Sequence, residues 1–407
     1  MAVALGAGAC HRSADPPSQD KPPAKAARHL PRAGHVIALG ASRDATAALL
    51  STGEVVRWGD SIDLAELAGE AIPTVVDGFA GATQLAVGGE FLCALVRDQV
   101  LCWGDDRRSQ LGHAASAAPG VTIDHDAVEV AVSGATGCAR MKDGTVQCWG
   151  STRARIAGVD RTEQPPTADF PAQVTPAPLP AIAGATALVV GNWSACARVG
   201  TANVCWGTNM GSQLGPVGDT VLQPAPNTAL AALDHLAIGD SAVCGIDGDG
   251  HAVCTGRRSG PPRDRRSAGL PVANTDAELG AFMAEHDRIA ADLAVARTLP
   301  NLEHVRAIAL GSRHGCAITG EGHVACWGDG ERGQLGDGST RERDEPGEVP
   351  GTTDAVAIAA GRDHTCVLTR ARDVLCWGNN VSGQLGDPSG TDQRAAPAHV
   401  VGLPNAS

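Results

Sequence analysis

Short apolar runs alternate with turns rich in Gly, Asp and Pro along most of the chain, and residues 355–378 show the pattern most cleanly. There, an apolar run ends in Gly361, a short loop follows, and a second apolar run contains Cys366. A polar turn then leads to a third run, which ends in Cys-Trp-Gly at 376–378. A Gly-Gln-Leu-Gly phrase precedes one more apolar run at 397–401. Short apolar runs bounded by turn residues are typical of β-strands, so this segment predicts four strands.

The same unit recurs seven times along the chain. A Trp-Gly step, in which Thr replaces Trp once, aligns the units at Trp58, Trp103, Trp149, Trp206, Thr255, Trp327 and Trp377. The intervals are roughly 45 to 57 residues, with one of roughly 72, and such periods are typical of repeat architectures. A four-stranded unit covers its apolar faces only by packing on neighbouring units, and seven units can close a ring. The pattern therefore predicts an all-β fold, a seven-bladed β-propeller of four-stranded blades over residues 34–405.

Three phrases within residues 311–336 narrow this prediction: Gly-x-x-His, Gly-x-Val-x-x-Trp-Gly and Gly-Gln-Leu-Gly. With them the chain resembles the regulator of chromosome condensation repeat family, although units one, three and five match the pattern poorly. The resemblance implies a seven-bladed propeller. The namesake of the family binds chromatin and promotes nucleotide exchange on a small GTPase, and a secreted β-lactamase inhibitory protein uses a similar propeller.

Twelve of the 13 cysteines form six pairs, nine or ten positions apart, one in each of the last six units. In the first unit, Ala47 and Arg57 occupy the equivalent positions, so both cysteines are missing together. Loss of one disulfide partner alone would leave a reactive thiol, so this all-or-none pattern favours disulfides between facing strands. The predicted disulfides are Cys93 with Cys102, Cys138 with Cys148, Cys196 with Cys205, Cys244 with Cys254, Cys316 with Cys326, and Cys366 with Cys376.

Metal ligation and buried reduced thiols are the alternatives for these cysteines. Six disulfides would indicate an oxidising, extracytoplasmic compartment, because cytosolic proteins seldom keep such bonds.

Cys10 is the remaining cysteine, and the small residues at 7–9 before it resemble the cleavage site of a bacterial lipoprotein signal. We expect a signal or lipoprotein-like N-terminus at 1–10, with Cys10 as a candidate lipidation site, and a disordered Pro/Ala-rich tether at 11–33. An ordinary signal remnant and an incidental free cysteine are the alternatives for Cys10. No later stretch reaches the roughly 20 apolar residues of a transmembrane helix, so a lipid at Cys10 is the only membrane attachment that we expect.

The long interval between the fifth and sixth repeats indicates an insertion at 257–300. It begins with a basic cluster between Arg257 and Arg266, which we interpret as a solvated loop. Residues 275–278 then have the spacing of a helix capping box, and the apolar residues that follow recur at helical intervals. An amphipathic helix is predicted near 276–297. It either packs on blade five or six or docks a partner.

The formal net charge of −13 argues against nucleic-acid binding, because attraction to phosphates needs clustered Lys and Arg. Chromatin binding is therefore not expected for this chain. The 51 Gly and 25 Pro supply tight turns, whereas an aromatic content of only 3% leaves an aliphatic core.

Several groups have the composition of reactive sites but occupy structural positions of the repeat. Gly239-Asp240-Ser241 superficially resembles a serine-nucleophile motif, but its Gly occupies the same position in the repeat as Gly88 and Gly361, so we interpret it as a turn. Asp247 and Asp249 likewise lie where each unit turns its hairpin. His314 and His364 each lie two residues before a cysteine, as a metal pair could, but in the family this histidine is a repeat residue. We predict no catalytic residue, no metal site and no cofactor, and we do not expect an enzyme.

The loops between the first and second strands of the blades are the candidate binding surface, because equivalent loops of a propeller form a ring on one face. Candidate partner-binding residues on this ring are Glu90, Phe91, Trp193, Arg313, His314, Asp363 and His364. Trp and Arg are enriched in protein-binding hot spots. Burial of Trp193 in a blade interface is the structural alternative.

We therefore expect a monomeric, non-enzymatic, extracytoplasmic scaffold that recognises a protein partner. The alternatives are a secreted enzyme inhibitor, a guanine-nucleotide exchange factor for a small GTPase, and a propeller hydrolase or lyase.

Overall fold

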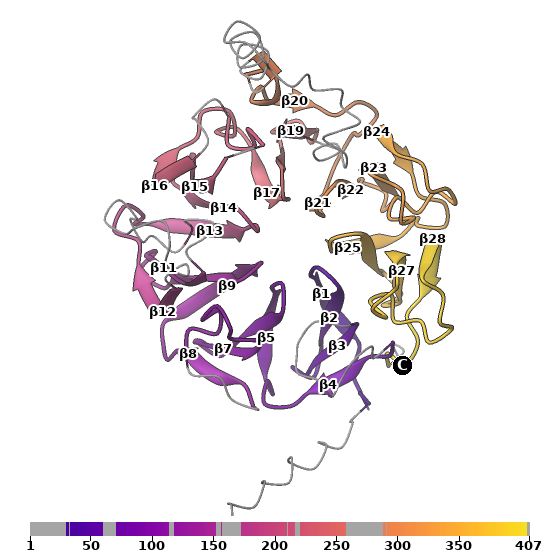
Figure 1. Ribbon diagram of the computed structural model, residues 1–407, viewed down its shortest axis with the longest axis horizontal. Helices are drawn as coiled ribbons and strands as arrows, with labels where there is room; N and C mark the ends of the chain where they lie inside the picture. The colour runs from indigo at the N-terminus through magenta and orange to yellow at the C-terminus, as the bar shows by residue number, and fades with distance from the viewer. Residues whose placement is uncertain are drawn as a thin grey trace, which may run out of the picture.

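The structure, a computed structural model, describes residues 30–31, 33–59, 71–113, 118–151, 156, 172–209, 211–215, 220–257, 288–289 and 291–404. It is a ring of seven four-stranded antiparallel sheets, each formed by four strands consecutive in sequence (Figure 1). The predicted seven-bladed propeller is confirmed. Most of 1–33, including Cys10, lies outside the described residues, as do 258–287, which hold most of the basic cluster and the start of the predicted helix.

The first four blades follow one another along the N-terminal part of the chain. Blade 1 comprises β1 (Val36–Ala41), β2 (Ala45–Leu50), β3 (Val55–Gly59) and β4 (Thr74–Val76). Blade 2 comprises β5 (Ala82–Val87), β6 (Phe91–Val96), β7 (Gln99–Gly104) and β8 (Gly120–Ile123). Blade 3 comprises β9 (Ala127–Ser133), β10 (Thr136–Met141), β11 (Val146–Ser151) and β12 (Ala172–Pro178). Blade 4 comprises β13 (Ala185–Val190), β14 (Ser194–Val199), β15 (Ala202–Thr208) and β16 (Thr220–Pro226).

The last three blades complete the ring. Blade 5 comprises β17 (Asp234–Ile238), β18 (Ala242–Ile246), β19 (Ala252–Gly256) and β20 (Arg297–Thr298). Blade 6 comprises β21 (Ala307–Leu310), β22 (His314–Ile318), β23 (Val324–Gly328) and β24 (Arg343–Glu348). Blade 7 comprises β25 (Ala355–Ala360), β26 (His364–Thr369), β27 (Val374–Asn379) and β28 (Gln393–His399).

The insertion lies within blade 5, which differs from the predicted position between the fifth and sixth repeats. Strand β20 follows the insertion and pairs with β19 through Val253 opposite Thr298 and Cys254 opposite Arg297. The long excursion therefore connects the third and fourth strands of one blade. Residues 288–289 and 291–293 are α-helical, within the range predicted for the helix. Among the described residues, no helix has both the length and the apolar character needed to cross a membrane.

The hydrophobic core is divided among the seven interfaces between neighbouring blades. Each of seven buried clusters combines residues of two adjacent blades, as in the cluster that packs Val146 and Ile182 of blade 3 against Trp206 of blade 4. No blade can bury its apolar faces alone, so the fold depends on a complete ring.

Six disulfides join the second and third strands of blades 2 to 7, as predicted from the spacing. In each blade the two cysteines are directly opposite in the strand register, with Cα–Cα distances of 4.0 to 4.1 Å. The predicted pairing therefore agrees with the structure in every blade that contains cysteines. The bonded pairs, in blade order, are Cys93 with Cys102, Cys138 with Cys148, Cys196 with Cys205, Cys244 with Cys254, Cys316 with Cys326, and Cys366 with Cys376.

Blade 1 has no disulfide and places Ala47 opposite Arg57 in the same register. The Arg57 side chain is buried there, with its guanidinium carbon 5.3 Å from the centre of the Trp103 ring of blade 2. A contact between neighbouring blades thus occupies the position that a disulfide takes in the other blades.

The Trp-Gly and Gln-Leu-Gly phrases contact each other across the blade interfaces. The indole N–H of a blade donates to a backbone carbonyl of the preceding blade: Trp149 to Gln110 at 2.9 Å, Trp377 to Gln334 at 2.9 Å, Trp58 to Gln384 at 3.0 Å and Trp206 to Ile156 at 2.9 Å. In blade 5, Thr255 replaces Trp, and its hydroxyl donates to the Gln213 carbonyl at 2.6 Å. Except at Ile156, the acceptor is the Gln of the Gln-Leu-Gly motif, so the two motifs form one repeated interblade bond.

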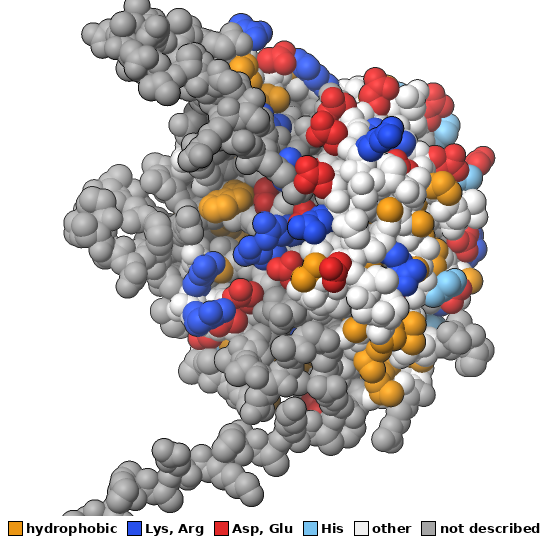
Figure 2. Space-filling model, turned by 45° about the vertical axis from the view of Figure 1, so that its right-hand side comes forward, with side chains coloured by type: hydrophobic (Ala, Val, Ile, Leu, Met, Phe, Trp, Pro, Cys, Tyr) orange, Lys and Arg blue, Asp and Glu red, His pale blue; other side chains and the backbone are white. Residues whose placement is uncertain are grey.

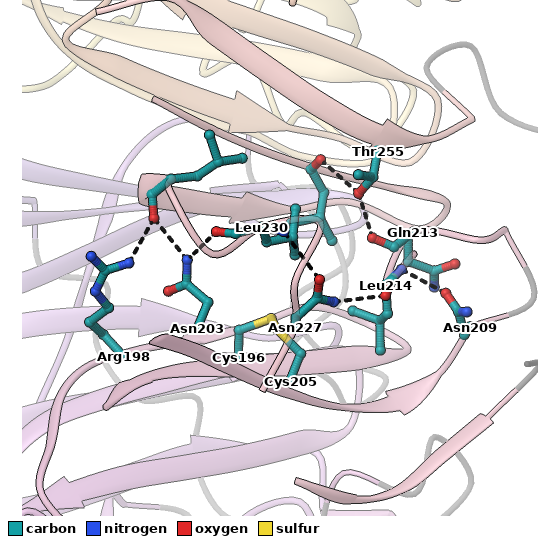
Figure 3. Close-up of a disulfide and its surroundings, with 12 residues drawn as sticks. Cys196, Arg198, Asn203, Cys205, Asn209, Gln213, Leu214, Asn227, Leu230 and Thr255 are labelled. Atoms are coloured by element: carbon teal, nitrogen blue, oxygen red, sulfur yellow. Dashed lines mark hydrogen bonds between the residues drawn. A yellow bond between two sulfur atoms is a disulfide. The ribbon is translucent and has the colours of Figure 1, made fainter. Parts of the chain in front are cut away.

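At the interface between blades 4 and 5, buried side-chain amides bond to backbone carbonyls near the Cys196–Cys205 disulfide (Figure 3). The amide of Asn203 donates to the carbonyls of Leu230 and Leu233, at 2.7 and 2.8 Å. Asn227 donates to the Leu214 carbonyl at 2.7 Å. These buried amides satisfy carbonyls that no strand partner reaches, so this irregular region keeps a fixed geometry.

Blades 7 and 1 close the ring without exchanging a strand, because each sheet is built from one end of the chain. The closure includes the Trp58 bond, a shared apolar cluster and a hydroxyl of blade 1. That hydroxyl, Thr46 Oγ1, lies 2.8 Å from His364 Nε2 and donates to the Gln384 carbonyl at 2.9 Å. Side-chain bonds, apolar packing and a backbone bond from Arg362 N to Ser42 O at 3.1 Å therefore hold the two ends of the chain together.

Candidate functional site

A cavity of about 430 Å³ opens at the centre of the ring, where the first strands of all blades converge (Figure 1). The loops between the first and second strands form its mouth, and every blade contributes to its lining. The lining includes Arg43, Glu90, Trp193, Asp240 and Arg362. The predicted ring of loops on one face is therefore present and surrounds a cavity.

Hydrogen bonds between neighbouring blades connect these loops into a collar. The collar bonds run from Gly89 N to Gly134 O at 2.7 Å, from Ser133 Oγ to Asn192 Oδ1 at 3.0 Å, from Asn192 Nδ2 to Asp240 Oδ1 at 2.5 Å, from Ser312 N to Arg362 O at 3.3 Å, and from Arg362 N to Ser42 O at 3.1 Å. They link blades 2 to 3, 3 to 4, 4 to 5, 6 to 7 and 7 to 1. The mouth of the cavity is thus a rigid platform for the side chains that it carries.

Two carboxyl groups of blade 2 share one arginine beside the cavity. Arg107 Nη2 lies 2.8 Å from Glu90 Oε2, and Arg107 Nε lies 2.8 Å from Asp105 Oδ1. Burial and the neighbouring Asp105 raise the pKa of Glu90 above its ordinary value. Burial also acts to raise the pKa of Asp105, but hydrogen bonds from Arg107 and Glu90 outweigh it, and its pKa is lowered. Arg107 therefore holds both groups in place.

Four of the seven predicted partner-binding residues lie at the accessible rim. Glu90, Trp193, Arg313 and Asp363 are partly exposed, and Glu90 and Trp193 line the cavity. Trp193 also packs against the apolar cluster between blades 3 and 4, in agreement with the structural alternative, while its role in partner binding stays a prediction. Arg313 Nε lies 3.5 Å from Asp329 Oδ2.

The other three predicted residues are interior. Phe91, His314 and His364 have relative exposures of 0, 2 and 0%, so a partner on the loops does not reach their side chains. Their position in the repeat explains this correction. Each is the first residue of a second strand, and its side chain is buried between neighbouring blades instead of lining the cavity.

Residues 305–334, 355–384 and 321–368 match family models described as the regulator of chromosome condensation (RCC1) repeat. The chain contains RCC1 repeats. It has the all-β seven-bladed architecture that these repeats form.

Solved structures of similar shape have low sequence identity to this RCC1-repeat chain. Human WBSCR16 is 18% identical, with a TM-score of 0.68 over 86% of this chain and 94% of that one. Prp20p from Saccharomyces cerevisiae is 17% identical, with a TM-score of 0.67 over 91% of this chain and 90% of that one. Yeast RCC1 (Prp20), in a structure with Kap60, is 18% identical, with a TM-score of 0.67 over 96% and 91%. At this identity the likeness shows the fold.

The histidine of the Gly-x-x-His motif of the RCC1 repeat takes part in hydrogen bonds between neighbouring blades. His314 Nε2 lies 2.8 Å from Thr365 Oγ1, whose hydroxyl donates to the Gln334 carbonyl at 3.3 Å. Since the hydroxyl hydrogen is used there, Nε2 of the histidine must donate, as it does from His364 to Thr46. A Cβ at Gly311 would lie 2.3 Å from the His314 ring, so the glycine leaves space for the imidazole.

Burial keeps both histidines neutral. It lowers the pKa of His314 to about 4, although Asp329 acts in the opposite direction. Burial, together with the nearby His314, lowers the pKa of His364 to about 3. Because Nε2 of each ring is bonded to a threonine hydroxyl, the structure supports an interblade role for these histidines.

The remaining candidate groups occupy turns, as the repeat phase predicts. Asp247, Asp249 and His251 have ligand atoms within 4.8 Å of one another, but Asp247 Oδ1 accepts the backbone N–H groups of the other two residues. These bonds, led by the one from His251, lower the pKa of Asp247. Ser241 donates to the Arg257 carbonyl at 3.3 Å.

Sequence reasoning missed Arg43, Asn192, Asp240 and Arg362 as site residues. They lie two positions before the first residue of the second strand, which pairs with the Gly of Trp-Gly. The sequence-based candidates were instead taken from that first residue and the residue before it. The signal was therefore in the sequence, one or two positions earlier in each repeat.

Proposed function

We propose that this RCC1-repeat propeller is a non-enzymatic, extracytoplasmic scaffold that binds a protein partner through the cavity face. The main support is the collar, a hydrogen-bonded platform whose side chains differ from blade to blade. Such a platform presents a defined surface with little loss of conformational entropy on binding. Trp193 and Arg313 at its rim are of the residue types enriched in hot spots.

The disulfides support the extracytoplasmic location. Six buried disulfides on one chain suit an oxidising compartment, since cytosolic reductants keep thiols reduced. A bacterial origin and a lipid at Cys10, the only membrane attachment in this proposal, would fit the lipoprotein-like start of the sequence.

Proteins of the same fold bind other proteins. The structure reports of the similar yeast chains describe binding to Gsp1p and histones and a complex with Kap60. A protein partner for a monomeric scaffold therefore has precedent within the fold. Nucleic acid is not proposed, because the net charge is −13 and the face in Figure 2 carries acidic and basic side chains side by side.

Paired carboxyl groups near the cavity do not favour an enzyme. Glu90 and Asp105 differ in pKa direction, as an acid and base pair can, but both are bonded to Arg107. A group that holds a salt bridge is poorly placed to move a proton of a substrate. We therefore propose binding as the function.

The test is capture of partners from an envelope extract by the full-length oxidised protein. Trp193→Ala and Arg313→Ala should each reduce the captured amount of the same protein by about tenfold or more. Arg370→Ala is the matched control, because its exposed turn between β26 and β27 lies on the opposite face. Equal capture by the wild type and both rim variants would place the interface elsewhere.

A further inference from the structure

We propose that the central cavity also binds a small dipolar molecule, a short peptide with free termini. Its carboxylate would lie at Arg43 and Arg362, and its ammonium group at Asp240. This site goes beyond the proposed protein scaffold, since it is the interior of the cavity and not its outer rim.

The anionic end of the ligand is assigned to two arginines on neighbouring blades. Arg43 belongs to blade 1 and Arg362 to blade 7, and their loops are joined by the bond from Arg362 N to Ser42 O. Each guanidinium has an ion pair within its own loop, Arg43 with Asp44 at 3.5 Å and Arg362 with Asp363 at 3.7 Å. These distances exceed the 2.7 to 2.9 Å typical of charge-assisted hydrogen bonds, and a guanidinium carries five donors. Both side chains can therefore bind a carboxylate.

The cationic end is assigned to Asp240 of blade 5. Blade 5 is three blades from blade 1 in one direction and four in the other, so Asp240 lies across the cavity from Arg43. Asn192 donates to Asp240 Oδ1 at 2.5 Å and is itself bonded to Ser133. Within the described part of the chain, no cation is paired with Asp240. The Asn192 bond thus orients the carboxylate, and no basic side chain of the described residues compensates its charge.

The rest of the lining is mixed and includes both polar side chains, such as Ser133 and Thr136, and apolar ones. The apolar residues Val87, Ile238 and Leu310 line the cavity together with glycines of several blades. A Cβ at Gly239 would lie 2.8 Å from the Gly311 carbonyl oxygen, so the glycine allows the loops of blades 5 and 6 to approach closely. A volume of about 430 Å³ lies in the range of small-molecule sites.

Overall charge favours a dipolar ligand over a simple anion. The chain carries a net charge of −13, which repels anions at long range, whereas a zwitterion has no net charge to repel. Opposite charges on opposite walls attract both ends of a zwitterion at the same time. A simple anion would use only the arginine side of the cavity and would face Asp240.

The test is calorimetric titration of the full-length oxidised protein with three probes: trialanine with free ends, N-acetyl-trialanine and trialanine amide. The free peptide should bind, and each blocked form should bind about 10- to 100-fold more weakly, because each lacks one charged contact. Asp240→Asn should weaken the free peptide to the level of the acetylated one and leave the acetylated one unchanged. Arg362→Gln should do the same for the amidated peptide.

Arg370→Gln on the opposite face is the matched control and should not change any affinity. The comparison of blocked and free peptides uses the wild-type protein, so it does not depend on the folding of a variant. Absence of binding, or affinities that do not respond to blocking, would overturn the proposal. Partner capture is measured separately, so loss of one result does not remove the other.

Discussion

Blade 1 offers a direct test of what the disulfides contribute, because it is the blade without one. Ala47 and Arg57 face each other in the register that holds cysteines in the other blades. The double substitution Ala47→Cys with Arg57→Cys should form a seventh disulfide. The pair is ten positions apart, as in Cys366–Cys376, and a closed loop of this size corresponds to about 3 kcal/mol of stabilisation in the chain-entropy estimate.

The substitution also removes a contact. The guanidinium of Arg57, 5.3 Å from the Trp103 ring centre, is buried, and such cation–π contacts contribute about 0.5 to 2 kcal/mol. The expected net gain in the free energy of unfolding is therefore about 1 to 2 kcal/mol over the wild type. Relative to Ala47→Ser with Arg57→Ser, which loses the same contact but cannot form the bond, the gain should approach about 3 kcal/mol.

The assay is guanidinium denaturation followed by Trp fluorescence, with non-reducing mass spectrometry to verify the new bond. A variant that forms the disulfide but is no more stable than the serine pair would refute the reasoning. The blades would then owe their stability to packing between neighbours, and the sulfur bridges would serve another purpose.

Three further outcomes follow from the same structure. Alkylation without reductant should leave the 12 propeller cysteines unmodified, and reactive thiols among them would contradict the structure. His314 and His364 have lowered pKa values, so their contribution to stability is complete above the unfolded pKa of 6.5 and is lost as the pH falls toward about 4. At pH 5 the loss should be about 2 kcal/mol for each histidine. The substitution His364→Gln should therefore make the denaturation midpoint fall less steeply with decreasing pH. Thr46→Val should speed amide hydrogen exchange in β1 and β25 more than Thr365→Val does, because only the first breaks the junction that no chain segment crosses; equal exchange would contradict this.

The architecture could be predicted from the sequence because the motif for each structural element recurs in several repeats. Six Trp-Gly steps and one Thr-Gly step set the blade count. The cysteine spacing of nine or ten positions set the register of the second and third strands, as in Cys138 opposite Cys148 and Cys316 opposite Cys326. The insertion was misplaced because β20 is only two residues long and carries no apolar pattern of its own. The local sequence of β20 does not indicate that it pairs with β19.

The site was harder to predict because alternation within a strand decides which side chains reach the cavity. Phe91, His314 and His364 were chosen as loop residues, but each already belongs to a second strand and points between blades. A shift of one residue in assigning a strand end reverses the direction of a side chain. Asp240 was dismissed with Ser241 as part of a turn, although a turn residue at the centre of a ring is also a cavity residue.

The repeats divide each blade into two kinds of position. Cysteines, the Trp indole and the Gln carbonyl bond to partners within or between blades, so a change there breaks a contact, unless another residue restores it as Thr255 does. The collar positions are held by backbone bonds in part, so Gly89, Ser312 and Arg362 occupy equivalent or adjacent sites with different side chains. Side-chain identity is therefore free to vary at the cavity mouth without loss of the fold. Binding specificity in such a ring should reside where the seven units differ, and the charges of Arg43, Asp240 and Arg362 are such differences.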